Sequence, residues 1–124
     1  MDGSTIASAL QLLVGLGLLN VWIVRSRSAT AYRGGSAASL RDEFVVYGLP
    51  TTVFYAVGGL KVSAALVLIV GVWIDLPVAL AAAVIAALMV GAVAMHVKVG
   101  DPPRKAAPAT LMLAMSSAIV LLTA

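Results

Sequence analysis

Apolar residues dominate four stretches of the chain, and shorter polar segments separate them. The stretches cover residues 5–24, 52–74, 77–97 and 106–123. About 20 apolar residues cross the roughly 30 Å hydrocarbon layer of a membrane as an α-helix, and each stretch is close to that length. The pattern predicts an all-α protein, a transmembrane four-helix bundle formed by one membrane domain over residues 1–124.

The longest polar segment, residues 25–50, divides into two parts. Its first part is rich in Ser, Gly and Ala, which is typical of a loop. In the second part Ser39 precedes Asp42 by three residues, a spacing typical of a helix N-terminus. Apolar side chains then recur at helical spacing, at Leu40, Phe44 and Tyr47. We expect a short amphipathic helix over about 39–49, lying at the membrane interface.

Small residues follow one face of the third apolar stretch. They recur every four positions, at Ala79, Ala83, Ala87 and Gly91. A row of small side chains lets two membrane helices pack closely. We therefore expect this row to form the contact of a homo-oligomer, which bulky substitutions there would break.

The composition agrees with a membrane protein and excludes several kinds of chemistry. The chain is 62% hydrophobic and only 10% charged, whereas soluble domains contain about 25% charged residues. It has no cysteine and one histidine, so disulfides, thiolate catalysis and cysteine-based metal sites are excluded within this chain. We expect no metal, no cofactor and no nucleic-acid partner.

The basic residues outside the apolar stretches lie in two segments. They are Arg25, Arg27, Arg33 and Arg41 in the first, and Lys98, Arg104 and Lys105 in the second. Cytoplasmic loops of membrane proteins carry an excess of Lys and Arg. The pattern predicts a multi-pass protein of the cell membrane, with loops 25–50 and 98–105 in the cytoplasm and both termini outside. These loops are also suited to anionic lipid headgroups of the bilayer.

Lys61 is the remaining basic residue, and it lies inside the second apolar stretch. A charge at the centre of a bilayer costs about 2.5–3.5 kcal/mol on insertion scales. Lys61 lies about 16 Å along the helix axis from Pro50 if the helix starts there. It lies only about 5–7 Å deep if the hydrocarbon begins near Val57. The second placement brings Lys61 into the same leaflet as His96.

The polar residues of the four stretches suggest a site in this leaflet. In one interpretation Lys61 and His96 form a donor-rich site for anion binding or proton transfer, with Asp101, Glu43 or Asp42 as a counter-charge. Asn20 lies at similar depth and Gln11 deeper in the bundle. In the other interpretation the Lys61 ammonium extends to the interface and His96 only ends its helix, while Asn20 and Gln11 form interhelical hydrogen bonds. No nucleophile and base are paired, so no catalytic residue is assigned.

The segments 58–73 and 86–109 carry a family resemblance. Gly-Gly-Leu-Lys opens the second stretch, and the third ends in Met-Val-Gly-Ala-Val-Ala-Met-His before a Gly-Asp-Pro loop. In these features the chain resembles the DoxX-like family of small four-helix membrane proteins. The resemblance implies a four-helix bundle with Lys61, His96 and Asp101 at the polar positions of the family. The family name comes from a membrane component associated with thiosulfate and quinone oxidation.

Together these observations favour an accessory or partner-binding membrane subunit without catalysis of its own. We expect it to bind a small hydrophobic ligand such as a quinone or lipid near Lys61 and His96, and to associate with a membrane oxidoreductase. The alternative is a small membrane enzyme or proton-coupled transporter that uses the same polar layer.

Overall fold

The protein is described by a computed structural model that covers residues 3–27, 30 and 32–124. Residues 1, 2, 28, 29 and 31, and the expectations that include them, lie outside the described residues. Four helices of the described chain are long and apolar enough to cross a membrane. They are α1 (Gly3–Leu19) with its π-helical extension η1 (Asn20–Val24), α3 (Thr51–Val70), α4 (Val78–Lys98), and α5 (Ala107–Thr123) with the preceding 3₁₀ turn η2 (Pro103–Ala106). The predicted all-α bundle of four membrane helices is confirmed.

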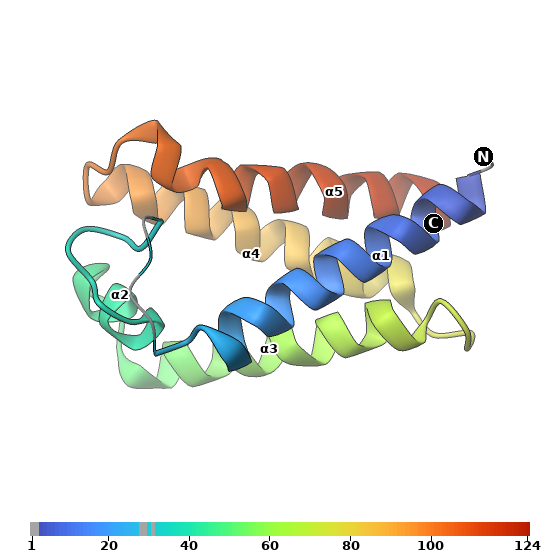
Figure 1. Ribbon diagram of the computed structural model, residues 1–124, viewed down its shortest axis with the longest axis horizontal. Helices are drawn as coiled ribbons and strands as arrows, with labels where there is room; N and C mark the ends of the chain where they lie inside the picture. Colours follow the sequence, from blue (N-terminus) through green and yellow to red (C-terminus); the bar gives the residue numbers. More distant parts are fainter. Residues whose placement is uncertain (1–2, 28–29, 31) are drawn as a thin grey trace.

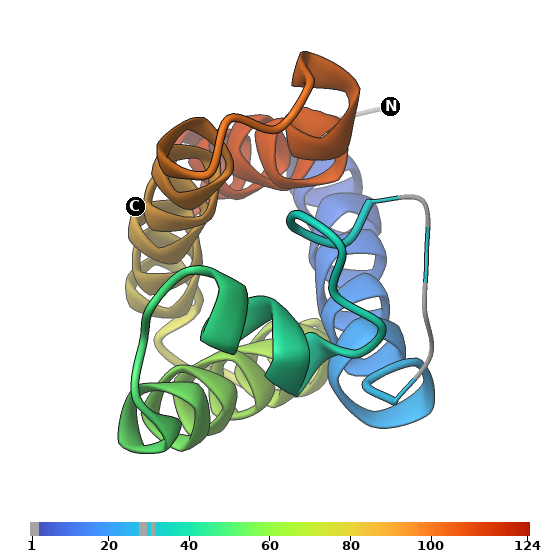
Figure 2. The ribbon, with the colours of Figure 1, turned by 90° about the vertical axis from the view of Figure 1, so that its left-hand side faces the viewer.

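The four long helices surround a common core in chain order. Helix α1 packs against α3 and α5, and α4 packs against the same two helices (Figure 2). Both chain termini lie at one end of the bundle, and the short helix α2 (Leu40–Val46) lies at the other (Figure 1). We call this second end, with residues 32–49 and 99–106, the capped end.

Helix α2 begins at the predicted residue for a physical reason. The Ser39 hydroxyl accepts a hydrogen bond from the backbone N–H of Asp42 at 3.1 Å, which satisfies a donor that a first helical turn leaves unpaired. Leu40 and Phe44 are buried on the face toward the bundle. Gly48 follows with a φ of +77°, a conformation that favours glycine and turns the chain toward α3.

Helix α3 ends at Val70, earlier than the residue 74 boundary expected from hydropathy. Gly71 follows the last helical residue, and the backbone of Gly71 is closely approached by Val78 at the start of α4. A Cβ built on Gly71 would lie 2.4 Å from Cγ2 of Val78 and 2.6 Å from the carbonyl oxygen of Val67. The apolar residues 72–74 therefore belong to the turn, and hydropathy alone does not distinguish them from the helix.

The core combines aliphatic side chains with a few satisfied polar groups. Its fully buried members include Val14, Leu68, Ile85 and Ile119. Gln11 is only 4% exposed, and its Nε2 donates to the carbonyl of Leu68 at 2.9 Å. A buried amide without a partner would cost about 1–3 kcal/mol, so this bond fixes α1 against α3.

The row of small residues on α4 faces away from the other helices of the chain. Ala83, Ala87 and Gly91 are exposed, and Ala79 is half-buried. A Cβ built on Gly91 would meet no atom within 4 Å. The row is thus not used to pack this bundle within the part of the chain described, and the homo-oligomer contact through it stays a prediction.

Two adjacent glycines on α3 give a matched test of helix packing. A Cβ on Gly58 would lie 2.6 Å from the Trp22 ring, whereas a Cβ on Gly59 would meet nothing within 4 Å. We expect Gly58→Ala to destabilise the protein, because overpacking costs about 1–3 kcal/mol. Gly59→Ala should be neutral or stabilising by up to about 1 kcal/mol through reduced backbone freedom. Thermal unfolding in detergent measures both, and equal melting temperatures would contradict the close packing of Trp22.

Candidate functional site

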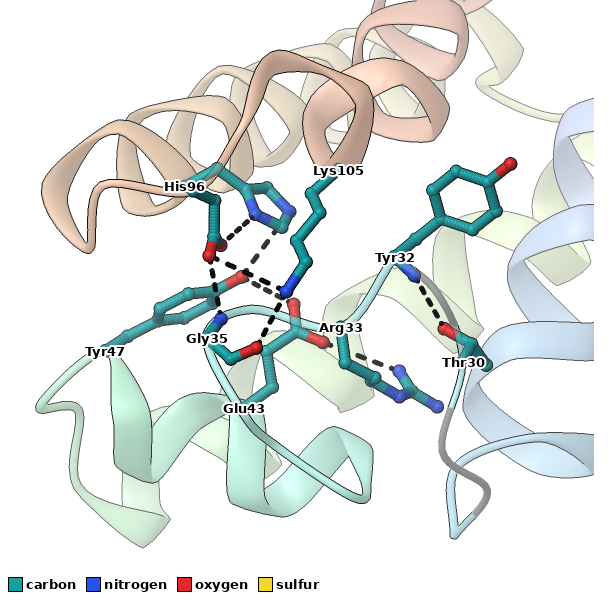
Figure 3. Close-up of polar contacts among 9 residues, drawn as sticks. Thr30, Tyr32, Arg33, Gly35, Glu43, Tyr47, His96 and Lys105 are labelled. Atoms are coloured by element: carbon teal, nitrogen blue, oxygen red, sulfur yellow. Dashed lines mark hydrogen bonds and ion pairs between the residues drawn. The ribbon is translucent and has the colours of Figure 1, made fainter.

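Asp101 is the centre of a polar network at the capped end. Its partners Gly35, His96 and Lys105 are labelled in Figure 3. Its Oδ2 lies 2.7 Å from Nδ1 of His96, and a carboxylate only accepts, so Nδ1 carries the proton. Its Oδ1 accepts from the backbone N–H of Gly35 at 2.9 Å and lies 3.8 Å from Nζ of Lys105. Lys105 also donates to the Gly35 carbonyl at 2.7 Å. One carboxylate therefore joins α4, η2 and the connector before α2.

Tyr47 extends the network on the other side of His96. The Tyr47 hydroxyl donates to Oε1 of Glu43 at 2.6 Å and lies 3.5 Å from Nε2 of His96. Arg33 pairs with the same carboxylate at 3.6 Å. On α4, Lys98 donates to the backbone carbonyl of Tyr47 at 2.8 Å. These contacts hold α2 against the end of α4, as Figure 3 shows for the side chains of Glu43, Tyr47 and His96.

Two acidic groups outside the helices that span the membrane have pKa values shifted in opposite directions, Tyr47 upward and Asp101 downward. Burial raises the pKa of Tyr47, and the Glu43 carboxylate raises it further, so the hydroxyl stays a donor at neutral pH. Burial also opposes ionisation of Asp101. The hydrogen bonds from His96 and Gly35 and the charge of Lys105 outweigh it, and they hold the pKa of Asp101 below its usual range.

Lys61 lies next to this network, against an aromatic cluster. Its Nζ is 5.4 Å from the centre of the Trp22 ring, a cation–π distance. Trp22 packs in turn on Phe44 and Phe54, with ring centres 5.9 Å and 5.3 Å away. Among the residues that the structure describes, the ammonium has no hydrogen-bond or ion-pair partner.

A cavity of about 250 Å³ opens beside Lys61 inside the capped end. One wall is apolar and comes from α1, α4 and α5, with Leu18, Met89, Ala92, Ala109 and Met112. The lining also includes the polar side chains Asn20, Arg33, Glu43, Lys61, His96 and Lys105. The cavity is therefore amphipathic, and most of its charged groups are cationic.

A second cavity, of about 220 Å³, lies on the other side of Lys61. It shares four lining residues with the first, and it continues along α4 to Ala87 and Gly91. The shared residues are Leu40, Glu43, Lys61 and Ala92. Because Ala87 and Gly91 are exposed on the outer face of α4, this cavity leads from the membrane-facing surface of the bundle toward Lys61.

The structure brings together most of the site residues expected from the sequence. Lys61, His96 and Asn20 line the first cavity. Asp101 contacts His96 behind the cavity wall. Gln11 is not part of this group, because its amide is used in the bond to Leu68 deeper in the bundle.

Several residues of the site were not expected from the sequence. Trp22 has the position of a membrane-interface anchor, but it packs inward over Gly58. Arg33 resembles an ordinary loop arginine, yet it is 5% exposed and donates to the carbonyl of Arg25 at 2.6 Å. Gly35 has a φ of +54°. In the sequence, the feature that could have indicated this folded segment is the pair Gly34-Gly35 next to Arg33, in an otherwise polar loop.

The sequence comparison agrees with the fold. The model of the DoxX-like family matches residues 28–119, which is most of the chain. The protein therefore belongs to the DoxX-like family, and the resemblance seen in the sequence is confirmed. No curated protein and no solved structure shows a significant similarity to the chain.

Replacing Asp101 tests the central role of its carboxylate. Asp101→Asn removes the ion pair with Lys105 and the charged acceptor of His96, so we expect a loss of about 1–3 kcal/mol. Hydrogen–deuterium exchange of residues 32–37 should become at least about tenfold faster, since 1.4 kcal/mol corresponds to a factor of ten. Asp75→Asn, in the exposed turn at the opposite end, is the matched control and should change neither quantity.

The lowered pKa of Asp101 also fixes the sign of its pH dependence. The pKa of an unperturbed Asp carboxyl, as in the unfolded chain, is 3.8. A carboxyl whose pKa is lowered in the folded protein contributes its full stabilisation at pH values above that unfolded pKa. This contribution disappears as the pH falls through the lowered pKa of the folded protein. The difference in stability between the protein and Asp101→Asn should stay constant between about pH 5 and 8 and shrink only in acid. A difference that already declines near neutral pH would contradict the assignment.

Proposed function

We propose that this DoxX-like protein is a non-catalytic binding subunit of the cell membrane. It holds a small apolar molecule with a carbonyl or acidic head, of the quinone or lipid class, in the cavity beside Lys61. It delivers or retains this ligand for a membrane oxidoreductase partner. The proposal rests on one observation, the Lys61 ammonium that lines an amphipathic cavity without an ion-pair partner among the described residues.

The energetics of a buried ammonium support this assignment. A charge taken out of water is stable when it gains hydrogen bonds or a counter-charge. Trp22 supplies a cation–π contact worth about 0.5–2 kcal/mol, which compensates only part of the desolvation. The nearby Glu43 is already bonded to Tyr47 and paired with Arg33. A carbonyl or carboxylate oxygen from a ligand would complete the environment of Lys61.

The shape and lining of the cavity favour a small amphipathic ligand. Its volume of about 250 Å³ is just below the usual range of about 300–1,000 Å³ for pockets that hold drug-sized ligands. A single ring with polar substituents suits this volume. The head would face Lys61 and Asn20, and the apolar part would face Met89 and Met112. The second cavity offers a route from the membrane side of α4.

Lys61→Met tests the binding function, because it keeps the length of the side chain and removes the charge. The probes are a short-chain benzoquinone, which quenches Trp22 fluorescence in a Trp73→Phe background, and a ten-carbon fatty acid, which relieves this quenching when it competes for the cavity. We expect Lys61→Met to raise the Kd at least about tenfold, as for loss of a charge-assisted hydrogen bond. Lys61→Arg should bind more tightly than Lys61→Met, and Arg104→Gln, outside the cavity lining, should bind normally.

Two outcomes would reject this function. The first is an unchanged Kd for both probes in Lys61→Met, with the same co-purifying proteins. The second is proton-driven substrate flux in proteoliposomes that Lys61→Met and His96→Gln both abolish. That result would support the transporter alternative, for which the hydrogen-bonded series Asp101, His96, Tyr47 and Glu43 would serve as the proton path.

The capped end faces the cytoplasm in this proposal, because the two connectors hold seven of the eight basic residues. The chain has no native cysteine, so single cysteines can report the side of the membrane. Arg104→Cys should react with an impermeant maleimide only in inverted vesicles, and Ala124→Cys only in intact cells. The reverse pattern would contradict the orientation, without affecting the binding proposal.

A further inference from the structure

A groove on the outer surface of the capped end lies behind Trp22, on the side away from the Lys61 cavity. Its volume is about 640 Å³. Only Trp22 is common to the linings of the groove and of the first cavity. The groove is thus a separate feature, and the proposed function makes no use of it.

One end of the groove is basic. Arg27 from the end of the first helix and Arg41 from the first turn of α2 both line it, together with the hydroxyl-bearing residues Ser26 and Ser39. Both arginines are exposed. Within the described residues neither guanidinium has a protein hydrogen bond or ion pair. None of the acidic residues in the described part of the chain lines the groove.

The rest of the groove is apolar and follows a helix that spans the membrane. Its lining continues along α3 through Tyr55, Gly59 and Val62. Gly59 is exposed and has open space where a side chain would stand. The missing side chain leaves a channel on the helix surface, beginning beside the two arginines.

We propose that this groove is the binding site of an anionic phospholipid. The phosphodiester accepts hydrogen bonds from Arg27 and Arg41. The forked N–H donors of a guanidinium match the spacing of two phosphate oxygens. One acyl chain lies over Gly59 toward Val62. A zwitterionic lipid binds less well, because its ammonium head would add a positive charge beside two arginines. A soluble phosphate would leave the apolar half of the groove unfilled.

Trp22 lies between the groove and the cavity, so its fluorescence reports lipid binding. In a Trp73→Phe background Trp22 is the only tryptophan. The protein is placed in bilayers in which either phosphatidylglycerol or phosphatidylcholine carries bromine atoms on the upper acyl carbons. We expect brominated phosphatidylglycerol to quench Trp22 with a relative binding constant at least about threefold above that of phosphatidylcholine.

Two pairs of variants make this test specific. The double variant Arg27→Gln with Arg41→Gln should lose the preference for phosphatidylglycerol, whereas Arg104→Gln, from the other basic connector, should keep it. Gly59→Leu should fill the channel and reduce quenching by the anionic lipid. Ala56→Leu is its matched control, because Ala56 is also exposed on α3 and lines neither the groove nor the two cavities.

Equal quenching by the two lipids in the unmodified protein would overturn the proposal, as would a preference that survives the double arginine variant. Quinone quenching in the double variant keeps the two proposals distinguishable. It should be unchanged, because Arg27 and Arg41 do not line the Lys61 cavity.

Discussion

The buried carboxylate of Asp101 is the constraint on which the capped end depends. It binds His96 at the end of α4, the backbone N–H of Gly35 in the connector, and the ammonium of Lys105 in η2. Gly35 and Asp101 are 66 residues apart in the chain, so these bonds close the two connectors onto each other. Without these hydrogen bonds and this ion pair, few interactions would hold the segment before α2 over the bundle. The cavity beside Lys61 would then lose one wall.

Membrane helices need such polar contacts more than soluble helices do. Lipid tails are as apolar as leucine, so burial of aliphatic side chains gives little preference for one helix neighbour over another. In this bundle the specificity comes from close approaches and hydrogen bonds, such as Gly58 under Trp22 and the amide of Gln11 on the Leu68 carbonyl. At the capped end, which lies closer to water than the middle of the bundle, ion pairs add to this specificity. The rigid frame that results positions Lys61 between two cavities.

The sequence predicted the elements of the fold because hydropathy and helix-start signals are local. The four spanning helices and the start of α2 at Ser39 follow from such signals. The pairing of His96 with Asp101 was expected in outline, since Gly100 and Pro102 turn the chain only a few residues after His96. Contacts between segments that are distant in the chain could not be predicted from the sequence. The inward position of Trp22, the burial of Arg33 and the role of Gly35 depend on how the connector folds back, and no local pattern encodes that path.

The central claim is that the Lys61 cavity holds a ligand in the membrane. An experimental density map of the protein, extracted from its own membrane into lipid nanodiscs without detergent, tests it most directly. We expect non-protein density within hydrogen-bonding distance of Lys61 Nζ, between Asn20 and the methionines of α4 and α5. A cavity without such density, with the Lys61 ammonium extended to water at the interface, would contradict it.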